Sequence, residues 1–366
     1  MTLDRILPAH VRPTATRRVS TIITAMRAVL ALSLAASALA GVPARAHAQV
    51  RGLTGTLLVT NKAPFMATII DVATGKALAT LPTGRGPHEI ALSRDGSTAV
   101  VTDYGSGPGD RSTLTVIDVP GMRVARTINL GEYRAPHGIL FLPGDSIVAV
   151  TSEASQTLVL VHVESGTVRK AIGTASAGSH MVGVTADGAT GYTGNMGSHT
   201  VSQLDLRTGT LMKSFPVPNT PEAISVTPDG REVWVGSNAT GRVSVVDPVT
   251  GTVTTAAEGV SWPYRVLFSP DTRTVVIPDM NHNEVRFLER SSRRELSRIA
   301  FPNAGPQGIT TSPDGRYIFL SLSKEARIAV IDARSRAVVG YIASGETPDG
   351  VVYTTKVMVK AGRRKP

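Results

Sequence analysis

The sequence predicts an all-β protein, a closed seven-bladed β-propeller with four-stranded blades, one of them built from both ends of the chain. Three observations lead to this fold. A similar segment occurs seven times at nearly constant spacing, most repeats hold four short strand patterns, and the two ends of the chain complement each other. With 18% charged residues, 4% aromatic residues, 35 Gly and 23 Pro, the composition is also typical of short strands and tight turns.

The repeat begins with the stretch "PHEIALSRDG" at Pro87, an apolar run that ends in a turn. The polar position after its first residue, here called the slot, recurs at spacings of 49, 43, 42, 42, 43 and 42 residues. A strand-rich repeat of this length indicates propeller blades. The seven slot residues are His88, His137, His180, Glu222, Tyr264, Gln307 and Asp349.

Each repeat contains four strands in a fixed order. The first follows the slot, and a turn leads to a second, as at Thr98–Asp103; a loop leads to a third, as at Thr113–Asp118, and another turn to a fourth. Acids that end the third strands are interpreted as caps of the next turn, since their oxygens can accept backbone N–H groups there. They are Asp71, Asp118, Asp205, Asp247 and Asp332.

The ends of the chain supply the missing parts of one blade. Residues Gly55–Pro82 have the second, third and fourth strand patterns but no first strand, whereas the slot at Asp349 is followed by a first strand alone. Joining the two segments closes the ring without a free strand edge. We therefore expect the propeller to span residues 53–359.

Residues 1–48 read as a leader with a signal peptide. The apolar run Ala28–Val42 is followed by small residues at Ala46 and Ala48, so we expect cleavage after Ala48. Residues 1–25 are interpreted as an over-extended start, with "TRRVS" at Thr16 as a twin-arginine alternative. The apolar run is too short for a membrane span. The sequence thus predicts an exported protein, periplasmic or at the cell surface, with no membrane span.

The formal charge of +10 is concentrated at the ends of the chain. The leader holds six Arg and one Asp, and five basic residues lie among the last eleven, so the body is neutral. Apart from the basic tail at 360–366, this balance argues against nucleic-acid binding, which needs a broad basic face. We expect a monomer whose partner is a small ligand or a protein.

The stretch "LLVTNKAPFMATIIDVATGKALATLPTGRGPHEIALSRDG", Leu57–Gly96, resembles the roughly forty-residue YVTN β-propeller repeat. The resemblance extends from about Leu57 to Val359 and implies the propeller fold. The family includes surface-layer and periplasmic proteins and borders lactonase-like, lyase-like and haem-binding propellers. A shared fold does not choose among these functions.

The first strand of a propeller blade is innermost, so the slot residues should surround one mouth of the central channel. Loops between second and third strands open on the same face and add Tyr104, Glu153 and Asn195 to the slot residues as expected ligand-binding groups. Three neighbouring slots hold imidazoles, the commonest ligands of transition metals, which makes His88, His137 and His180 candidate metal ligands. Glu222 and His137 are the candidates for catalysis, as a general base or metal ligand.

Three interpretations of this face remain open. The histidines can be structural, can contact a small ligand or cofactor, or can hold a divalent metal ion. We expect a non-enzymatic binding scaffold first, with a metal-assisted lactonase- or lyase-like enzyme, or haem carriage, as alternatives. The chain has no Cys, and we find neither a Gly-x-Ser-x-Gly elbow nor a phosphate-binding Gly-rich loop. An insertion at Gly105–Ser112 is a candidate lid or partner contact.

Overall fold

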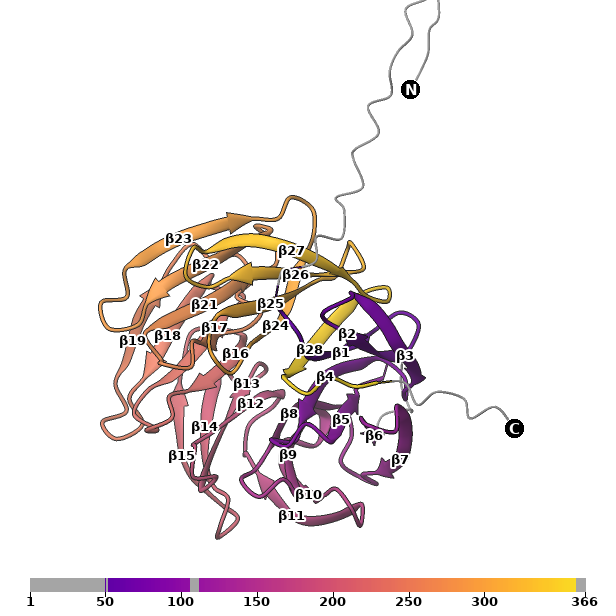
Figure 1. Ribbon diagram of the computed structural model, residues 1–366. Coiled ribbons are helices and arrows are strands. Elements are labelled where there is room, and N and C mark those ends of the chain that lie inside the picture. The colour runs from indigo at the N-terminus through magenta and orange to yellow at the C-terminus, as the bar shows by residue number, and fades with distance from the viewer. Residues whose placement is uncertain (1–49, 51, 106–111, 360–366) are drawn as a thin grey trace, which may run out of the picture. The chain divides into compact units, whose positions relative to one another are not determined.

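The computed structural model describes residues 50, 52–105 and 112–359, which form seven four-stranded antiparallel sheets arranged in a ring. The sheets are the predicted blades, and Figure 1 shows them following one another around the ring in chain order. The expected closed seven-bladed propeller is therefore confirmed. Among the described residues the structure contains no helix long and apolar enough to cross a membrane.

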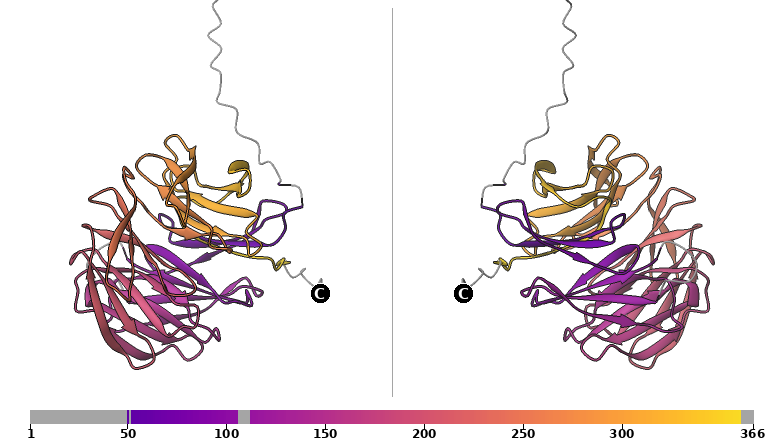
Figure 2. Two further views of the ribbon diagram at one scale, coloured as in Figure 1. Left: turned by 90° about the vertical axis from the view of Figure 1, so that its left-hand side faces the viewer. Right: turned by 90° about the vertical axis from the view of Figure 1, so that its right-hand side faces the viewer.

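Blade 1 combines both ends of the described chain. Its innermost strand is β28 (Pro348–Thr354), which pairs antiparallel with β1 (Thr56–Asn61) in a register that places Leu58 opposite Val352. The blade continues with β2 (Met66–Asp71) and β3 (Lys76–Pro82). Both views in Figure 2 show the yellow β28 strand beside the indigo start of the chain. The shared blade follows the sequence prediction.

The remaining blades each use consecutive strands, from the innermost to the outermost. Blade 2 contains β4 (Pro87–Leu92), β5 (Thr98–Asp103), β6 (Thr113–Asp118) and β7 (Arg123–Asn129). Blade 3 contains β8 (Pro136–Phe141), β9 (Ile147–Ser152), β10 (Thr157–His162) and β11 (Thr167–Gly173), with the short 3-10 helix η1 (Glu153–Ser155) between β9 and β10. Blade 4 contains β12 (Ser179–Val184), β13 (Thr190–Asn195), β14 (Thr200–Asp205) and β15 (Thr210–Pro216).

Blades 5 to 7 complete the ring in the same way. Blade 5 contains β16 (Pro221–Val226), β17 (Val233–Ser237), β18 (Arg242–Val246) and β19 (Val253–Ala257). Blade 6 contains β20 (Leu267–Phe268), β21 (Thr274–Asp279), β22 (Glu284–Glu289) and β23 (Glu295–Ala300). Blade 7 contains β24 (Pro306–Thr311), β25 (Tyr317–Leu322), β26 (Arg327–Asp332) and β27 (Ala337–Ala343).

The hydrophobic core lies between the blades. Successive side chains of a strand point to opposite faces of its sheet, so Leu57 and Val59 of β1 pack against blade 7 while Leu58 packs against blade 2. Such a cluster joins each pair of neighbouring blades, including blades 7 and 1. Each fully buried Leu or Val contributes roughly 2 kcal/mol of transfer free energy. The ring is thus closed by packing as well as by the shared sheet.

Hydroxyl groups on the second strands hold the slot backbone of the following blade. Thr60 donates to the carbonyl of His88 at 2.8 Å, Thr151 to that of His180 at 2.6 Å, and Ser321 to that of Asp349 at 2.7 Å. Because these hydroxyls are buried, their bonds remove a desolvation cost and also set the position of the inner strands. The slot positions are therefore anchored from the neighbouring blade.

The acids at the ends of the third strands cap turns, as predicted. Asp205 accepts hydrogen bonds from the backbone N–H groups of Arg207 and Thr208, both at 2.8 Å. These bonds hold the pKa of Asp205 below its ordinary value. The other four accept equivalent N–H groups two or three residues ahead, namely Asp71, Asp118, Asp247 and Asp332.

The first strand of blade 6 departs from the expected repeat. A strand was expected directly after the slot at Tyr264, but β20 covers only Leu267–Phe268, and Pro263 forms an isolated bridge to Asp279. Between them, the guanidinium of Arg265 donates to the backbone carbonyl of Tyr264 at 2.6 Å. This interruption brings a long charged side chain to the inside of the ring.

Three expectations fall outside the described residues. They are the leader at 1–48 with its cleavage after Ala48, the basic tail at 360–366, and the central part of the insertion at Gly105–Ser112. They stay predictions from the sequence.

Candidate functional site

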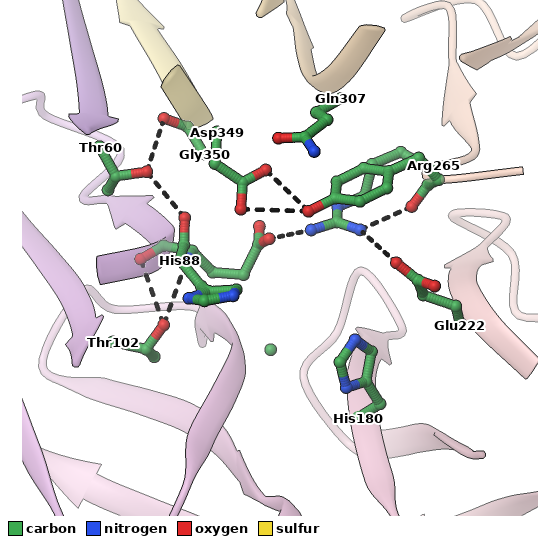
Figure 3. A network of polar contacts seen from close by, with 12 residues as sticks. Thr60, His88, Thr102, His180, Glu222, Arg265, Gln307, Asp349 and Gly350 are labelled. Atoms are coloured by element: carbon green, nitrogen blue, oxygen red, sulfur yellow. Dashed lines mark hydrogen bonds and ion pairs between the residues drawn. The ribbon is translucent and has the colours of Figure 1, made fainter. Parts of the chain in front are cut away.

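Six of the seven slot residues lie on the inner strands of the ring, and the seventh, Tyr264, lies between the Pro263 bridge and the short strand β20. His137, His180, Glu222, Tyr264 and Asp349 are all less than about a tenth exposed, which is unusual for such polar groups. Figure 3 shows slot side chains from several blades, among them His88, His180, Glu222, Gln307 and Asp349, directed toward a shared space. The structure thus brings together groups that are up to 261 residues apart in the chain.

Three imidazoles form one contiguous group, here called the imidazole cluster: His88, His137 and His180. The ring of His137 stacks on that of His180 with centroids 3.6 Å apart and planes inclined by 28°, and it lies 5.0 Å from the ring of His88. Tyr104 packs against the cluster, 4.7 Å from His88 and 5.0 Å from His137. Consecutive blades therefore place their imidazoles in direct contact.

Two of the imidazoles have a fixed tautomer. Nδ1 of His88 lies 2.8 Å from the carbonyl oxygen of Gly86, and since a carbonyl only accepts, this nitrogen carries the proton. Nδ1 of His180 donates to Oε2 of Glu153 at 2.8 Å. Burial and the positive charge of Lys62 lower the pKa of His88 to about 4. Neutral His88 therefore keeps an unprotonated Nε2 at pH 7.

Glu153 is held from two sides. Its Oε2 accepts both the His180 bond and a hydrogen bond from the Tyr104 hydroxyl at 3.1 Å. Burial alone would raise the pKa of Glu153, but these two donors hold it below its ordinary value. Glu153 is therefore an ionised group that orients His180.

Nδ1 of His137, unlike Nδ1 of His88 and His180, has no hydrogen bond to orient the ring. His137 is only 2% exposed, and its Nδ1 is buried without a hydrogen-bond partner among the described residues. Burial, followed by the neighbouring imidazoles, lowers the pKa of His137 well below its ordinary value. A neutral imidazole with an unsatisfied nitrogen is costly to bury unless a ligand completes it.

The other part of the site, here called the charged network, comprises Lys62, Glu89, Glu222, Tyr264, Arg265 and Asp349. The Tyr264 hydroxyl donates a hydrogen bond to Oδ1 of Asp349 at 3.0 Å and accepts one from Nζ of Lys62 at 3.1 Å. The same Nζ forms an ion pair with Asp349 at 2.7 Å. Although burial opposes ionisation, Lys62 holds the pKa of Asp349 below its ordinary value. Burial raises the pKa of Tyr264, so the phenol stays protonated.

Arg265 crosses between blades 6 and 2. Its guanidinium contacts the carboxylate of Glu89, 176 residues away, and lies 3.9 Å from Oε1 of Glu222. Burial works against its charge, but Glu89 and the other surrounding acids raise the pKa of Arg265 further. Glu222 also accepts a hydrogen bond from Asn238. Neither Arg265 nor Glu89 was predicted as a site residue; the available signal was a charge directly after the slot, where other blades have Gly, Met or Ala.

Two predicted positions behave differently from the rest. Gln307 donates to the sulfur of Met280 at 3.2 Å, and its Oε1 is buried without a partner among the described residues. Asn195, which was expected to contact a ligand, is fully buried, and its side-chain amide forms its hydrogen bonds within its own blade. It accepts from Ser179 and Thr193 and donates to Thr200 and Ser202. Asn195 is therefore a structural hub of blade 4.

The site carries an excess of negative charge. The charged network and the carboxylate beside the imidazole cluster provide four acids, Glu89, Glu153, Glu222 and Asp349, against two cations, Lys62 and Arg265. Counting all four acids as ionised and no charge on the imidazoles, the formal charge is −2; burial raises the pKa of Glu89, and Arg265 opposes that rise. Because these groups are largely removed from water, their field is weakly screened and favours a cation.

A second group of potential metal ligands lies outside the slots. Asp279, His282 and Glu284 offer atoms within 4.8 Å of one another. Arg286 occupies this position, however, with Nε 2.9 Å from Glu284 and a terminal nitrogen 3.7 Å from Asp279. The guanidinium already neutralises the carboxylates there.

Comparisons with known proteins agree with the fold. No family model matches the chain, and a search of curated proteins finds no match, so the resemblance to the YVTN repeat stays a prediction. Among solved structures, the chain is similar to one described as Kuenenia stuttgartiensis hydrazine synthase, with a TM-score of 0.67 and 19% identity over 76% of this chain and 92% of that chain. At this identity the likeness shows the fold alone.

Proposed function

We propose that this protein is an exported binding propeller that holds a small cationic ligand at the slots, without chemical conversion of that ligand. One observation carries the proposal: the imidazole cluster, in which Nδ1 of His88 and His180 are engaged and Nε2 is left as the acceptor, adjoins a site with four acids and two cations. A propeller suits such a role because its rigid blades preorganise groups from distant parts of the chain. Export rests on the signal-like leader at 1–48.

The bonding of the acidic groups supports binding over catalysis. A general base needs a carboxylate that is free to take a proton near the operating pH. Glu222 is bonded to Asn238 and faces Arg265, while Asp349 is bonded to Lys62 and Tyr264. Taking a proton would require either acid to give up these partners. The open acceptors are on the imidazoles.

The test compares cationic and neutral probes. Thermal unfolding is measured with putrescine, with its neutral analogue 1,4-butanediol, and with Zn²⁺. A cation present at 100 times its Kd should raise the free energy of unfolding by about 2.7 kcal/mol, which corresponds to roughly 5 °C in Tm for a chain of this size. Butanediol should have no effect. Glu222→Gln should weaken the response to putrescine, whereas Glu258→Gln, an exposed control with a side chain 62% accessible, should not.

The proposal fails if neither putrescine nor Zn²⁺ raises Tm, or if the rise is equally large in the slot variants. Hydrolysis of an aliphatic lactone that depends on His137 or Glu222 would favour the enzymatic alternative instead. A Soret band in the purified protein would favour haem.

A further inference from the structure

We propose that the imidazole cluster binds one first-row transition-metal ion, such as Zn²⁺ or Cu²⁺, through nitrogens of His88, His137 and His180. The inference rests on the proposed cation-binding function and names the class of cation. Imidazole nitrogens are favoured ligands of these borderline metals, whereas Mg²⁺ and Ca²⁺ prefer oxygen. Three protein nitrogens leave one tetrahedral position for water or a ligand.

The first support is the orientation of two rings by outer groups. Metal-binding histidines almost always donate their second ring N–H to a carboxylate or a backbone carbonyl. His88 does so to Gly86 at 2.8 Å, and His180 does so to Glu153 at 2.8 Å. Both bonds leave Nε2 as the available ligand. The Tyr104 hydroxyl, 3.1 Å from Glu153, extends the support by one more group.

The second, independent support is the unpartnered nitrogen of His137. The side chain is 98% removed from solvent, yet Nδ1 has no hydrogen-bond partner among the described residues. Leaving such a group unsatisfied costs about 1–3 kcal/mol. A metal ion bound at Nδ1 of His137 would supply the missing partner of this atom.

The spacing of the rings defines what binding requires. With an ion about 2.1 Å from each nitrogen, tetrahedral angles set the ring centroids roughly 5 Å apart. His88 and His137 already lie 5.0 Å apart, whereas His137 and His180 are stacked at 3.6 Å. The ligand atoms of the three imidazoles do not all lie within 4.8 Å of one another in the structure, so binding requires the rings to move. His137 must rotate out of the stack and separate from His180 by about 1 Å or more. No bond to its Nδ1 opposes that rotation.

The charges around the cluster favour a divalent ion. The two cations of the site are already engaged, Lys62 by Asp349 at 2.7 Å and Arg265 by Glu89. The site therefore holds two more carboxylates than cations, although Glu222 also faces Arg265 and Glu153 is hydrogen-bonded to His180. One divalent ion would neutralise this excess.

The experiment uses full-length protein purified without a polyhistidine tag and stripped by a chelator. Zn²⁺ is titrated by calorimetry, and Cu²⁺ is examined by electron paramagnetic resonance for hyperfine splitting from nitrogen ligands. We expect one equivalent in the wild type and a loss of affinity of more than about 100-fold in His137→Ala. Glu153→Gln should weaken binding about 10- to 100-fold by loosening His180. His282→Ala is the matched control and should bind as the wild type does.

The outcomes separate this inference from the proposed function. Failure of Zn²⁺ and Cu²⁺ to bind, together with stabilisation by putrescine that depends on Glu222, overturns the metal site and leaves cation binding in place. Absence of both effects overturns both proposals. Binding that His282→Ala abolishes places the ion at Asp279 and Glu284 and also overturns the inference. If His137→Ala fails to fold by circular dichroism, Glu153→Gln decides: wild-type affinity in that variant contradicts the proposed site.

Discussion

Replacing Arg265 with Met should destabilise the ring through two buried acids. Arg265 is 8% exposed, and its side-chain neighbours Glu89 and Glu222 have side chains only 13% and 5% exposed. Met retains the apolar stem but removes the charge that both carboxylates face. Removing one partner of a buried ion pair costs about 3–5 kcal/mol, because the remaining charge stays desolvated. The 3.9 Å separation from Glu222 is consistent with this scale, since it corresponds to about 4 kcal/mol at an effective dielectric constant of 20.

The assay is thermal unfolding of Arg265→Met at two pH values. At pH 7.5, about 2 °C per kcal/mol predicts a Tm roughly 6–10 °C below that of the wild type. Burial already raises the pKa of Glu89 above its ordinary value although Arg265 opposes this, so removing Arg265 should raise the folded-state pKa of Glu89 further. The destabilisation of Arg265→Met relative to the wild type is then fully present above this folded-state pKa, and it shrinks as the pH falls through that pKa. The gap between variant and wild type should narrow at pH 5.

Two controls make the reasoning refutable. Arg298→Met removes an exposed guanidinium, 46% accessible in its side chain and paired with Glu284 and Glu295, and should cost at most about 1 kcal/mol. The double variant Glu89→Gln, Arg265→Met should recover part of the lost Tm. A decrease below about 2 °C for Arg265→Met at pH 7.5, or an equal decrease at pH 5, would refute the buried-charge account.

Three further predictions concern closure, turn capping and acid stability. Deleting Asp349–Pro366 removes most of β28 and should lower Tm by more than about 10 °C, since the innermost strand of blade 1 and its packing are lost; an unchanged Tm argues against the shared blade. Asp205→Ala should lower Tm slightly through its two lost turn bonds and leave Zn²⁺ affinity unchanged, and altered affinity in calorimetry would contradict a purely capping role. In metal-free protein, the pKa of His88 lies at about 4, below its ordinary value of 6.5. Neutral His88 therefore contributes to the free energy of unfolding above pH 6.5, and this contribution is lost as the pH falls toward 4. Measured by urea unfolding, the free energy of unfolding of the wild type should fall over that pH range by up to about 3 kcal/mol more than that of His88→Gln. Equal decreases in the two proteins would show that His88 is not the titrating group.

The fold was predictable because repetition and closure are both visible in the chain. The recurring slot set the blade period, and apolar runs such as that in β1, which packs Leu57 and Leu58 against different blades, mark strands buried on both faces. The complementary ends required a shared first blade. Blade 6 was the exception: its inner strand is interrupted where the Arg265 side chain bonds to the Tyr264 carbonyl, and no local pattern indicates this.

The site was predictable only as a set of positions. Topology placed the slots at one end of the inner strands, but contacts across the ring depend on side-chain reach. The pairing of Arg265 with Glu89 joins blades 6 and 2, and no repeat spacing indicates it. Asn195 shows the opposite error: its polar side chain suggested a ligand contact, whereas the hydroxyl groups of its own blade satisfy it. Composition cannot distinguish such internal satisfaction from an open group.

Anomalous diffraction can locate a metal ion bound at the imidazole cluster. Crystals of the full chain, grown without a polyhistidine tag and soaked in Zn²⁺, would be measured on both sides of the zinc absorption edge. The structure predicts one strong anomalous peak bounded by His88, His137 and His180, with His137 rotated out of its stack on His180. A ring that stays stacked with no peak beside it, or a peak beside Asp279 and His282 instead, would contradict the account.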